Sequence, residues 1–459
     1  MMNEHLQEWY RNNEDRVRAL AHDIWSHPES SMHEAYACQQ VAQFMSQEGF
    51  TVKTAPVLPG ENAVVNTVYA TYGSGKPVIG ILGEYDALEA LGQKAVPYQS
   101  AIDSPGHGCG HNLICACSVA AASALKAAME AEQLQGTLVY IAAPSEENLS
   151  GKVYLASQGY FDDLDVCLCW HPGGMTTCFD NIVMTATTNI VFEFQGKTAH
   201  AGGAPWDGRS ALDAAELMSV GVNYLREHMT PDCRVHYIYQ DAGAAPNIVP
   251  EHASVYYFIR SRDENNGDLV QRVKNIAEGA ALMTGTTMKY NTLTHCSGTV
   301  TSMALNQFCY QSALKVPALE YTEEEYAFAR ELYCNVTGAE QPLADEKLLP
   351  VNLHNPMENE LFVGGSSDVG DVSHITPTIQ VCGCGMVNKL PTHHWCTTAT
   401  TGTSIGEKGA VYASKQLAQC GYDIFQTPEV IADFRQSWQQ FKEEKNMPAY
   451  EKFPLPELK

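Results

Sequence analysis

The residues most capable of chemistry stand together in residues 107–112, His-Gly-Cys-Gly-His-Asn. Two imidazoles and a thiol alternate there with glycines, which allow positive φ angles and a close backbone approach to a ligand. The alanine-rich segment 114–130 follows and is predicted to be a mostly buried helix. A helix N-terminus and a nearby cation lower the pKa of a thiol, so we expect Cys109 to be held as a metal-binding thiolate. A tight turn with a buried cysteine would also explain the hexapeptide alone.

Further candidates follow three short apolar runs, residues 77–82, 136–142 and 165–170. Runs of this kind, separated by helical stretches, indicate a largely parallel sheet that is covered on both faces. In such sheets ligands bind beyond the carboxyl ends of the strands. The polar residues that stand at these three ends are Glu84, Asp86, Glu146, Glu147 and His171. The sequence therefore predicts a site at that edge, to which His393 or His394 could be added from a later strand end.

These side chains suit the hydrolysis of an amide. A thiolate, carboxylates and three imidazoles can hold two divalent cations and leave a coordination position open for water. Glu146 and Glu147 are adjacent at a strand-to-loop junction and point in different directions. One of them can bind metal while the other takes a proton from the attacking water, as metal-assisted hydrolysis requires. Taken singly, a Glu-Glu pair or a His-Pro is more often a solvated loop or a turn.

Length and composition limit the number of domains, the kinds of partner and the cellular compartment. A chain of 459 residues is expected to form two domains. The net charge of −25 argues against nucleic acid and anionic membranes as partners, and an anionic substrate would need a local cation. No secretory segment is visible at the start, and the apolar run 113–131 contains Lys126, which indicates a core helix. Fifteen scattered cysteines suit a reducing cytoplasm better than a disulfide framework.

The character of the chain changes near residue 187. The predicted order is strand, helix, strand, strand, helix, strand, which is the ferredoxin-like arrangement of an open sheet with two helices on one face. The predicted elements are 189–194, 210–228, 234–240, 253–260, 268–283 and 288–294. We therefore expect an inserted domain at 187–298, and a discontinuous first domain at 1–186 and 299–459. The first domain is completed by a buried strand at 377–383 and a helix at 405–420.

Several motifs together resemble the M20 metallopeptidase and amidohydrolase family, in its subgroup with a Cys-Gly-His metal motif. They are Gly-Cys-Gly-His (108–111), Pro-Ser-Glu-Glu (144–147), Trp-His-Pro (170–172), Phe-x-Gly-x-x-Ala-His-Ala (194–201) and Asn-Ile-Val-Pro (247–250). The resemblance covers nearly the whole chain except 320–360. It implies an α/β fold, with a zinc-peptidase-like catalytic domain of mixed, largely parallel sheet and an inserted ferredoxin-like dimerisation or lid domain.

The resemblance also implies roles for individual residues. The metal ligands of the family match Cys109, His111, Glu147, His171 and His393. The Pro-x-His pattern of the family falls on His393 and not on His394. Glu146 matches the general base, and Asp86 is expected to orient a ligand.

Three residues of the inserted domain match substrate-handling positions of the family. His200 matches a histidine that crosses a dimer interface to stabilise the oxyanion in the partner's site. Asn247 and Arg260 match residues that hold the carbonyl and the carboxylate of the substrate. Arg260 would be the local cation that the negative net charge calls for, because a guanidinium binds a carboxylate through two hydrogen bonds. By position alone, His200 and Arg260 could equally be surface residues.

One departure from the wider family stands after the first buried strand. Many members carry His-x-Asp there, whereas this chain has Glu84-Tyr85-Asp86. The Cys-Gly-His subgroup also lacks that histidine, and Cys109 takes its place as a ligand. Asn112 stands where many members of the subgroup have Asp.

The expected function is that of a cytoplasmic, metal-dependent amidohydrolase that acts on an aromatic N-acyl amino acid, with p-aminobenzoyl-glutamate as the best single substrate. An aminoacylase or dipeptidase is the alternative within enzymes. A non-catalytic or partner-dependent subunit of a heteromeric hydrolase is the alternative from another class. The resemblance implies two divalent metal ions per chain, for which manganese is favoured and zinc also fits. It further implies a homodimer, or a heterodimer with a related subunit, formed through 187–298.

Overall fold

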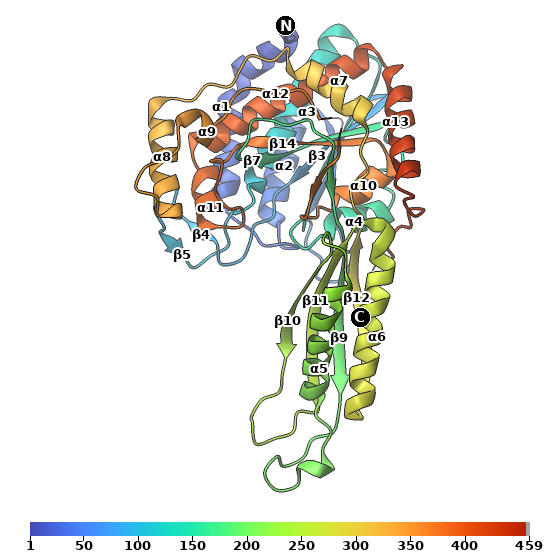
Figure 1. The fold of residues 1–459 in the computed structure, drawn as a ribbon. Coiled ribbons are helices and arrows are strands. Elements are labelled where there is room, and N and C mark those ends of the chain that lie inside the picture. Colours follow the sequence, from blue (N-terminus) through green and yellow to red (C-terminus); the bar gives the residue numbers. More distant parts are fainter. Residues whose placement is uncertain (358, 456–459) are drawn as a thin grey trace.

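A six-stranded sheet forms the centre of the larger part of the molecule, which we call the body (Figure 1). The computed structural model describes residues 1–357 and 359–455. In sheet order the strands are β1 (Thr51–Ala55), β2 (Thr67–Ser74), β6 (Gly136–Ala143), β3 (Val78–Glu84), β7 (Val166–Gly173) and β14 (Thr378–Gly385). The four strands from β6 to β14 are parallel, and β1 and β2 run antiparallel to their neighbours. The predicted mixed, largely parallel sheet is confirmed.

Helices cover both faces of this sheet. On one face α3 (His111–Glu132) packs against α1 (Glu4–Ser26) and α12 (Ser404–Gln426), and α2 (Ala35–Gln47) packs beside them. On the other face α4 (Gly151–Ser157) and α10 (Val369–Ile375) contribute to a second apolar cluster. By length and composition α3 could cross a membrane, but 89% of its most apolar window is buried inside the protein.

The second sheet projects from the body as an elongated arm, residues 186–296 (Figure 1). Its antiparallel strands, in sheet order, are β10 (Arg234–Asp241), β11 (His252–Ser261), β9 (Ala186–Gln195) and β12 (Thr287–Cys296). The helices α5 (Ala211–Leu225) and α6 (Asp263–Thr284) pack on one face of this sheet. The arm has its own apolar core, in which Phe192, Phe194 and Tyr257 are fully buried.

The remaining elements are short or lie near the surface. They are β4 (Gly92–Gln93), β5 (Ala101–Ile102), β8 (Ile182–Met184), β13 (Leu361–Val363), η1 (Pro205–Asp207), η2 (Arg226–His228), α7 (Met303–Ala313), α8 (Glu323–Thr337), α9 (Asp345–Leu348), α11 (Trp395–Thr401) and α13 (Val430–Glu444). The helix α13 lies in the C-terminal tail. Its polar face is exposed, and its other face carries the buried side chains of Ile431, Phe434 and Phe441.

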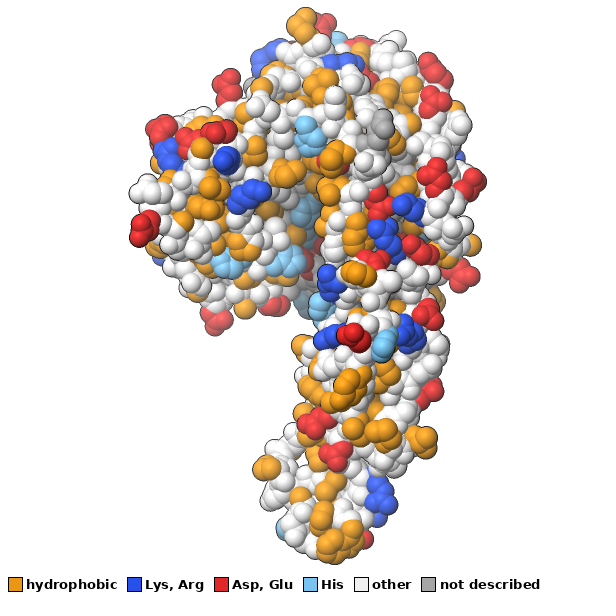
Figure 2. Space-filling view, viewed as in Figure 1, with side chains coloured by type: hydrophobic (Ala, Val, Ile, Leu, Met, Phe, Trp, Pro, Cys, Tyr) orange, Lys and Arg blue, Asp and Glu red, His pale blue; other side chains and the backbone are white. Residues whose placement is uncertain are grey.

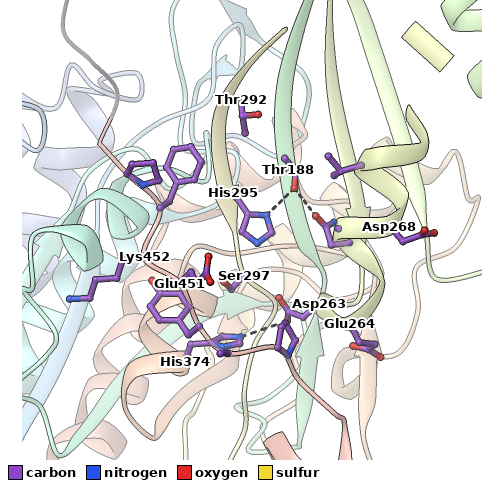
Figure 3. A pocket seen from close by; sticks show the side chains of 18 of the residues that line it. Thr188, Asp263, Glu264, Asp268, Thr292, His295, Ser297, His374, Glu451 and Lys452 are labelled. Carbon is purple, nitrogen blue, oxygen red and sulfur yellow. Dashed lines mark hydrogen bonds and ion pairs between the residues drawn. The ribbon is translucent and has the colours of Figure 1, made fainter. Parts of the chain in front are cut away.

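The junction of body and arm encloses a cavity of about 690 Å³ (Figure 3). Figure 3 shows His374 pointing toward Asp263, and the Nε2 and Oδ2 atoms of these residues are 3.7 Å apart. Beside them the Thr188 hydroxyl lies 2.9 Å from Nδ1 of His295. The C-terminal segment crosses this junction, where the Tyr450 hydroxyl donates a hydrogen bond to Asp371. The predicted metal ligands do not line this cavity in the described chain, so it belongs to the junction between the sheets.

Candidate metal centre

Three predicted ligands converge at the carboxyl edge of the six-stranded sheet. Cys109 lies in the loop before α3, His111 is the first residue of α3, and His171 lies near the end of β7. The Cys109 Sγ and His171 Nε2 atoms are 3.3 Å apart. One donor atom from each of the three residues lies within 4.8 Å of the other two. The parallel strands end at one edge of the sheet, which is why residues so distant in sequence meet there.

A second triangle of donor atoms shares Cys109 with the first. It consists of Cys109, Glu147 and His393, again within 4.8 Å of one another. The His393 Nε2 atom lies 3.5 Å from Glu147 Oε2, and the His393 backbone N–H donates to the Gly108 carbonyl. A thiolate in both triangles can contact two cations, which fits a dinuclear site.

The structure distinguishes the two neighbouring histidines. His393 has a φ of 52°, and this left-handed conformation accompanies its place beside Glu147. His394 instead caps α11, where its ring accepts a hydrogen bond from the Cys396 backbone N–H. The site therefore gathers His393 and leaves His394 in a capping position.

Asp86 fixes the orientation of the His111 ring. Its Oδ1 lies 2.9 Å from His111 Nδ1, which leaves Nε2 directed at the carboxylates of the site. Asp86 also accepts hydrogen bonds from the Glu147 backbone N–H and the Ser31 hydroxyl. Burial raises the pKa of Asp86, but the hydrogen bond and charge of His111 outweigh it and hold that pKa at about 2. A permanently charged Asp86 keeps the ring in the tautomer that a metal ion needs.

The two adjacent glutamates occupy different environments. Glu147 belongs to the Cys109 triangle, and burial followed by the charges of Asp86 and Glu84 raises its pKa to about 7 against the opposing effect of His111. Glu146 Oε2 lies 3.8 Å from His111 Nε2. Burial and the charges of Glu84 and Asp368 raise the pKa of Glu146 well above its usual value. A carboxylate with a raised pKa is suited to accepting a proton from water.

The backbone before this pair is held by a buried carboxylate, Glu34, that no motif in the sequence points to. Ser145 has a φ of 57°, and its N–H donates a 2.7 Å hydrogen bond to Glu34 Oε1. Glu34 is fully buried at the N-terminus of α2 and also accepts from Asn66. It thereby fixes the turn that directs Glu146 and Glu147 to the site.

The expectation of a metal-bound thiolate at Cys109 stays a prediction, and burial of the thiol acts against it unless a cation is bound. Burial, followed by the charge of Glu147, raises the pKa of Cys109 to about 12, although His111 opposes this rise. Cys109 precedes α3 by two residues, and full burial outweighs the effect of the helix N-terminus. A bound cation is what would displace the thiol proton.

Unpaired polar atoms show that the residues fit a cation. His111 Nε2, Glu147 Oε1 and Glu84 Oε2 are buried and have no hydrogen-bond partner within the described chain. Buried polar atoms of this kind are rare unless an ion or water satisfies them. Because three such atoms face one another, the donor set fits divalent metal.

A buried charge network borders the site, and most of it was not predicted from the sequence. Lys152 is fully buried in α4, and its Nζ lies 2.8 Å from Glu84 Oε1. Lys152 also pairs with Asp368, which accepts hydrogen bonds from its Nζ and its backbone N–H. Glu84 forms a further group of possible ligands with His111 and Glu146. The place of Glu84 after an apolar strand was visible in the sequence, whereas a lysine among apolar residues gives no such signal.

Of the residues assigned to substrate handling, Arg260 lies nearest the metal ligands. It is half-buried at the end of β11, and its Nη1 donates to the Ser366 hydroxyl at 3.3 Å. Its charge is close enough to contribute to the lowered pKa of His393, after burial and the charge of His111. Figure 2 shows histidine side chains around a hollow between body and arm.

His200 and Asn247 lie elsewhere, at the far end of the arm. Both are exposed, and the Ala201 N–H donates to the Asn247 carbonyl. The His200 ring accepts hydrogen bonds from the N–H groups of Gly202 and Gly203. The loops that follow β9 and β10 carry these two residues and meet at the end of the arm away from the body, so a single chain keeps the two residues together but apart from the metal ligands (Figure 1).

Comparisons with known proteins agree with this geometry. The model of peptidase family M20/M25/M40 matches residues 80–396. One subunit of the p-aminobenzoyl-glutamate hydrolase of Escherichia coli (strain K12) is 34% identical, over 95% of this chain and 96% of that protein. The Xaa-Arg dipeptidase of Mus musculus is 27% identical, over 92% of this chain and 89% of that protein.

A solved structure shares the fold. It is the aminobenzoyl-glutamate utilization protein from Klebsiella pneumoniae, with a TM-score of 0.64 and 20% sequence identity. The match covers 92% of this chain and 99% of that one. Body and arm are thus both present in a protein of known structure.

Proposed function

The chain belongs to peptidase family M20/M25/M40, and we propose from this premise that it hydrolyses p-aminobenzoyl-glutamate to p-aminobenzoate and glutamate. The observation that carries the proposal is the convergence of Cys109, His111, Glu147, His171 and His393 beside Glu146. The choice of substrate is supported by the name of the E. coli relative, which is similar along nearly its whole length.

The same five ligands would hold two divalent cations. Manganese is our first choice and zinc the second, because a mixed set of sulfur, nitrogen and oxygen donors admits both. Bound cations would supply Lewis acidity at the scissile carbonyl.

The chain's own residues supply the proton transfers and the substrate contacts. Glu146 accepts the proton of the attacking water and passes it to the leaving amine. Asp86 holds the His111 ring in place throughout, through the hydrogen bond to Nδ1. Arg260 binds the carboxylate of the amino acid, for which a guanidinium is the best-matched side chain.

We propose that a second copy or a related subunit completes the site through the arm, residues 187–298. His200 would then stabilise the oxyanion in the partner's site and Asn247 would hold the carbonyl. Support comes from the exposure of both residues and from the apolar side chains Leu217, Val220 and Tyr224, which stand exposed on α5. The E. coli relative is named as a subunit, which supports a heterodimer as the alternative.

We also propose a reducing, cytoplasmic location. All fifteen cysteines are free thiols, thirteen of them buried. Small buried thiols are stable in a reducing compartment.

The proposal is tested by p-aminobenzoate release from p-aminobenzoyl-glutamate, with added manganese, with added zinc and after chelation. We expect release that depends on metal and that Glu146→Gln abolishes. No release from the folded, metal-loaded chain would contradict the activity of this chain alone. A panel of N-acyl amino acids and Xaa-Arg dipeptides then separates the proposal from an aminoacylase or dipeptidase. Amidation of the substrate carboxylate should abolish binding if Arg260 holds it.

A further inference from the structure

A second group of metal-binding side chains lies outside the candidate metal centre. Cys178 and Asp180 follow β7, and His354 lies on the segment before β13. The Cys178 Sγ and Asp180 Oδ2 atoms are 3.0 Å apart, and His354 Nε2 lies 3.0 Å from the same Oδ2. Sγ and Nε2 are 4.0 Å apart. We propose that Cys178, Asp180 and His354 bind a divalent cation of the zinc type, separate from the catalytic pair.

The donor chemistry favours zinc. Thiolate, imidazole and carboxylate are the three ligand types that zinc uses in proteins, usually in tetrahedral sites. The His354 side chain is 41% exposed, so water can reach a fourth coordination position. Hard cations such as magnesium prefer oxygen donors, and a set with one oxygen offers them little.

The charge of Asp180 provides an independent reason for a cation. Its side chain is only 2% exposed, and its hydrogen bonds come from Cys178, His354 and the Met357 backbone N–H. Within the described chain no lysine or arginine pairs with it, and His354 is its one ion-pair partner. His354 supplies a positive charge only when it is protonated, and a buried carboxylate whose one ion-pair partner is neutral is costly. A divalent cation between the three donors would supply that charge.

The geometry requires a small adjustment. Tetrahedral zinc with bonds of about 2.0 to 2.3 Å places its ligand atoms roughly 3.3 to 3.7 Å apart. The two 3.0 Å separations are shorter than that, because the thiol and the imidazole donate protons to Asp180 in the absence of metal. On zinc binding the Cys178 thiol would release its proton to solvent, and the His354 Nε2 proton would move to Nδ1 or be released. The exposed His354 can move outward by a few tenths of an ångström, and a rotation of the Cys178 side chain would widen the other separation.

The position of the group indicates its role. Cys178 pairs with Cys382 of β14, and Cys382 is the neighbour of His171 in the sheet. Two strand spacings, roughly 10 Å, therefore separate this group from the candidate metal centre. His354 brings in the segment that continues into β13, which pairs with β8 shortly after Asp180. The cation would fasten this segment to the edge of the sheet without contacting the substrate.

The test is the zinc content of the purified full-length chain after zinc loading and removal of free metal. We expect Cys178→Ser and His354→Ala each to bind about one zinc per chain less than the unchanged protein. Cys334→Ser, which alters a half-buried thiol on α8, is the matched control and should bind the full amount. Zinc should also raise the melting temperature of the unchanged protein more than that of either variant.

Equal zinc content in all four proteins would overturn the inference. His354 is exposed, so its variant is expected to fold, and a circular dichroism spectrum checks this. The inference is independent of the proposed function, because p-aminobenzoate release should persist in both variants. If release is absent from every protein but the zinc difference remains, the proposed function fails and this site stands.

Discussion

The carboxyl edge of the body and the far end of the arm differ in completeness. At the edge, Cys109, His111 and His171 are buried or half-buried, and their donor atoms lie within 4.8 Å of one another. At the end of the arm, His200 and Asn247 are exposed, and their described hydrogen bonds stay within the two loops that meet there. One chain thus brings the candidate metal ligands together by itself, whereas the residues proposed to contact the scissile carbonyl would need a partner chain.

The two regions differ in what positions their residues. The edge is determined by strands that end together and by buried carboxylates that hold its loops. In our proposal the far end of the arm acts only when a partner chain is bound. Loss of a metal ligand, or of the residue that orients one, should therefore change metal binding, whereas changes at Glu146 or at the far end should change turnover alone.

Removal of metal should have the largest effect. After chelation and dialysis we expect turnover to fall below detection, because the carbonyl loses its Lewis acid. The measurement is p-aminobenzoate release alongside metal content, with circular dichroism as the control for folding. Full activity in a chain shown to be metal-free would contradict the proposed role of the metal ligands in catalysis.

Glu146→Gln should lower turnover by roughly 10²- to 10⁴-fold, the usual contribution of a general base. Metal content should be unchanged, because the five proposed ligands remain. Glu130→Gln, on an exposed part of α3, is the control and should behave as the unchanged protein. A variant that lost metal together with activity would make Glu146 a ligand.

His200→Ala should lower kcat by about 10²- to 10³-fold, the loss expected for one oxyanion donor. This would occur although the residue lies far from the metal ligands in its own chain. Metal content should again be unchanged, and His228→Ala, an exposed histidine of the same arm, serves as the control. Unaltered kcat would end the proposed role of the arm in catalysis.

Asp86→Asn should weaken metal binding by about 10- to 100-fold, because the hydrogen bond that orients His111 loses its charge. Titration of the metal-free chain with manganese measures this. Turnover at saturating metal should recover most of its original value. If affinity is unchanged, the His111 ring is held in place by packing and not by Asp86.

The smallest effect concerns pH. Burial, followed by the charge of Asp86, raises the pKa of Glu34 to about 8, above the value of 4.5 for the unfolded chain. A raised folded-state pKa stabilises the protein at low pH, and this contribution is lost as the pH rises through 8. The metal-free chain should therefore lose more unfolding free energy between pH 5 and pH 8 than Glu34→Gln does. Equal losses in urea titrations would show that Glu34 does not titrate in this range.

Much of the body could be predicted because its strands are short apolar runs whose ends carry polar residues. The edge formed by β3, β6 and β7 is one example. The boundaries were less accurate, since α3 begins at His111 and not at residue 114. Gly110, in the left-handed conformation, precedes the helix and so places His111 in its first turn.

The buried charges could not be predicted in the same way. Lys152, Glu84 and Asp368 form one network although they lie on three distant segments. Their sequence neighbours show no pattern that distinguishes a buried lysine from an exposed one. The effect of burial on the pKa of Cys109 could not be predicted for a related reason, because the sequence shows the neighbouring helix end and not the depth of burial.

The most direct test co-expresses Glu146→Gln with His200→Ala and measures p-aminobenzoate release by the mixture. Each variant alone should be nearly inactive. In a mixed dimer one site would combine an intact Glu146 with an intact His200 from the partner, so the mixture should recover about a quarter of full activity. Activity no greater than the sum of the two variants would contradict the account, because His200 would not act across a dimer interface.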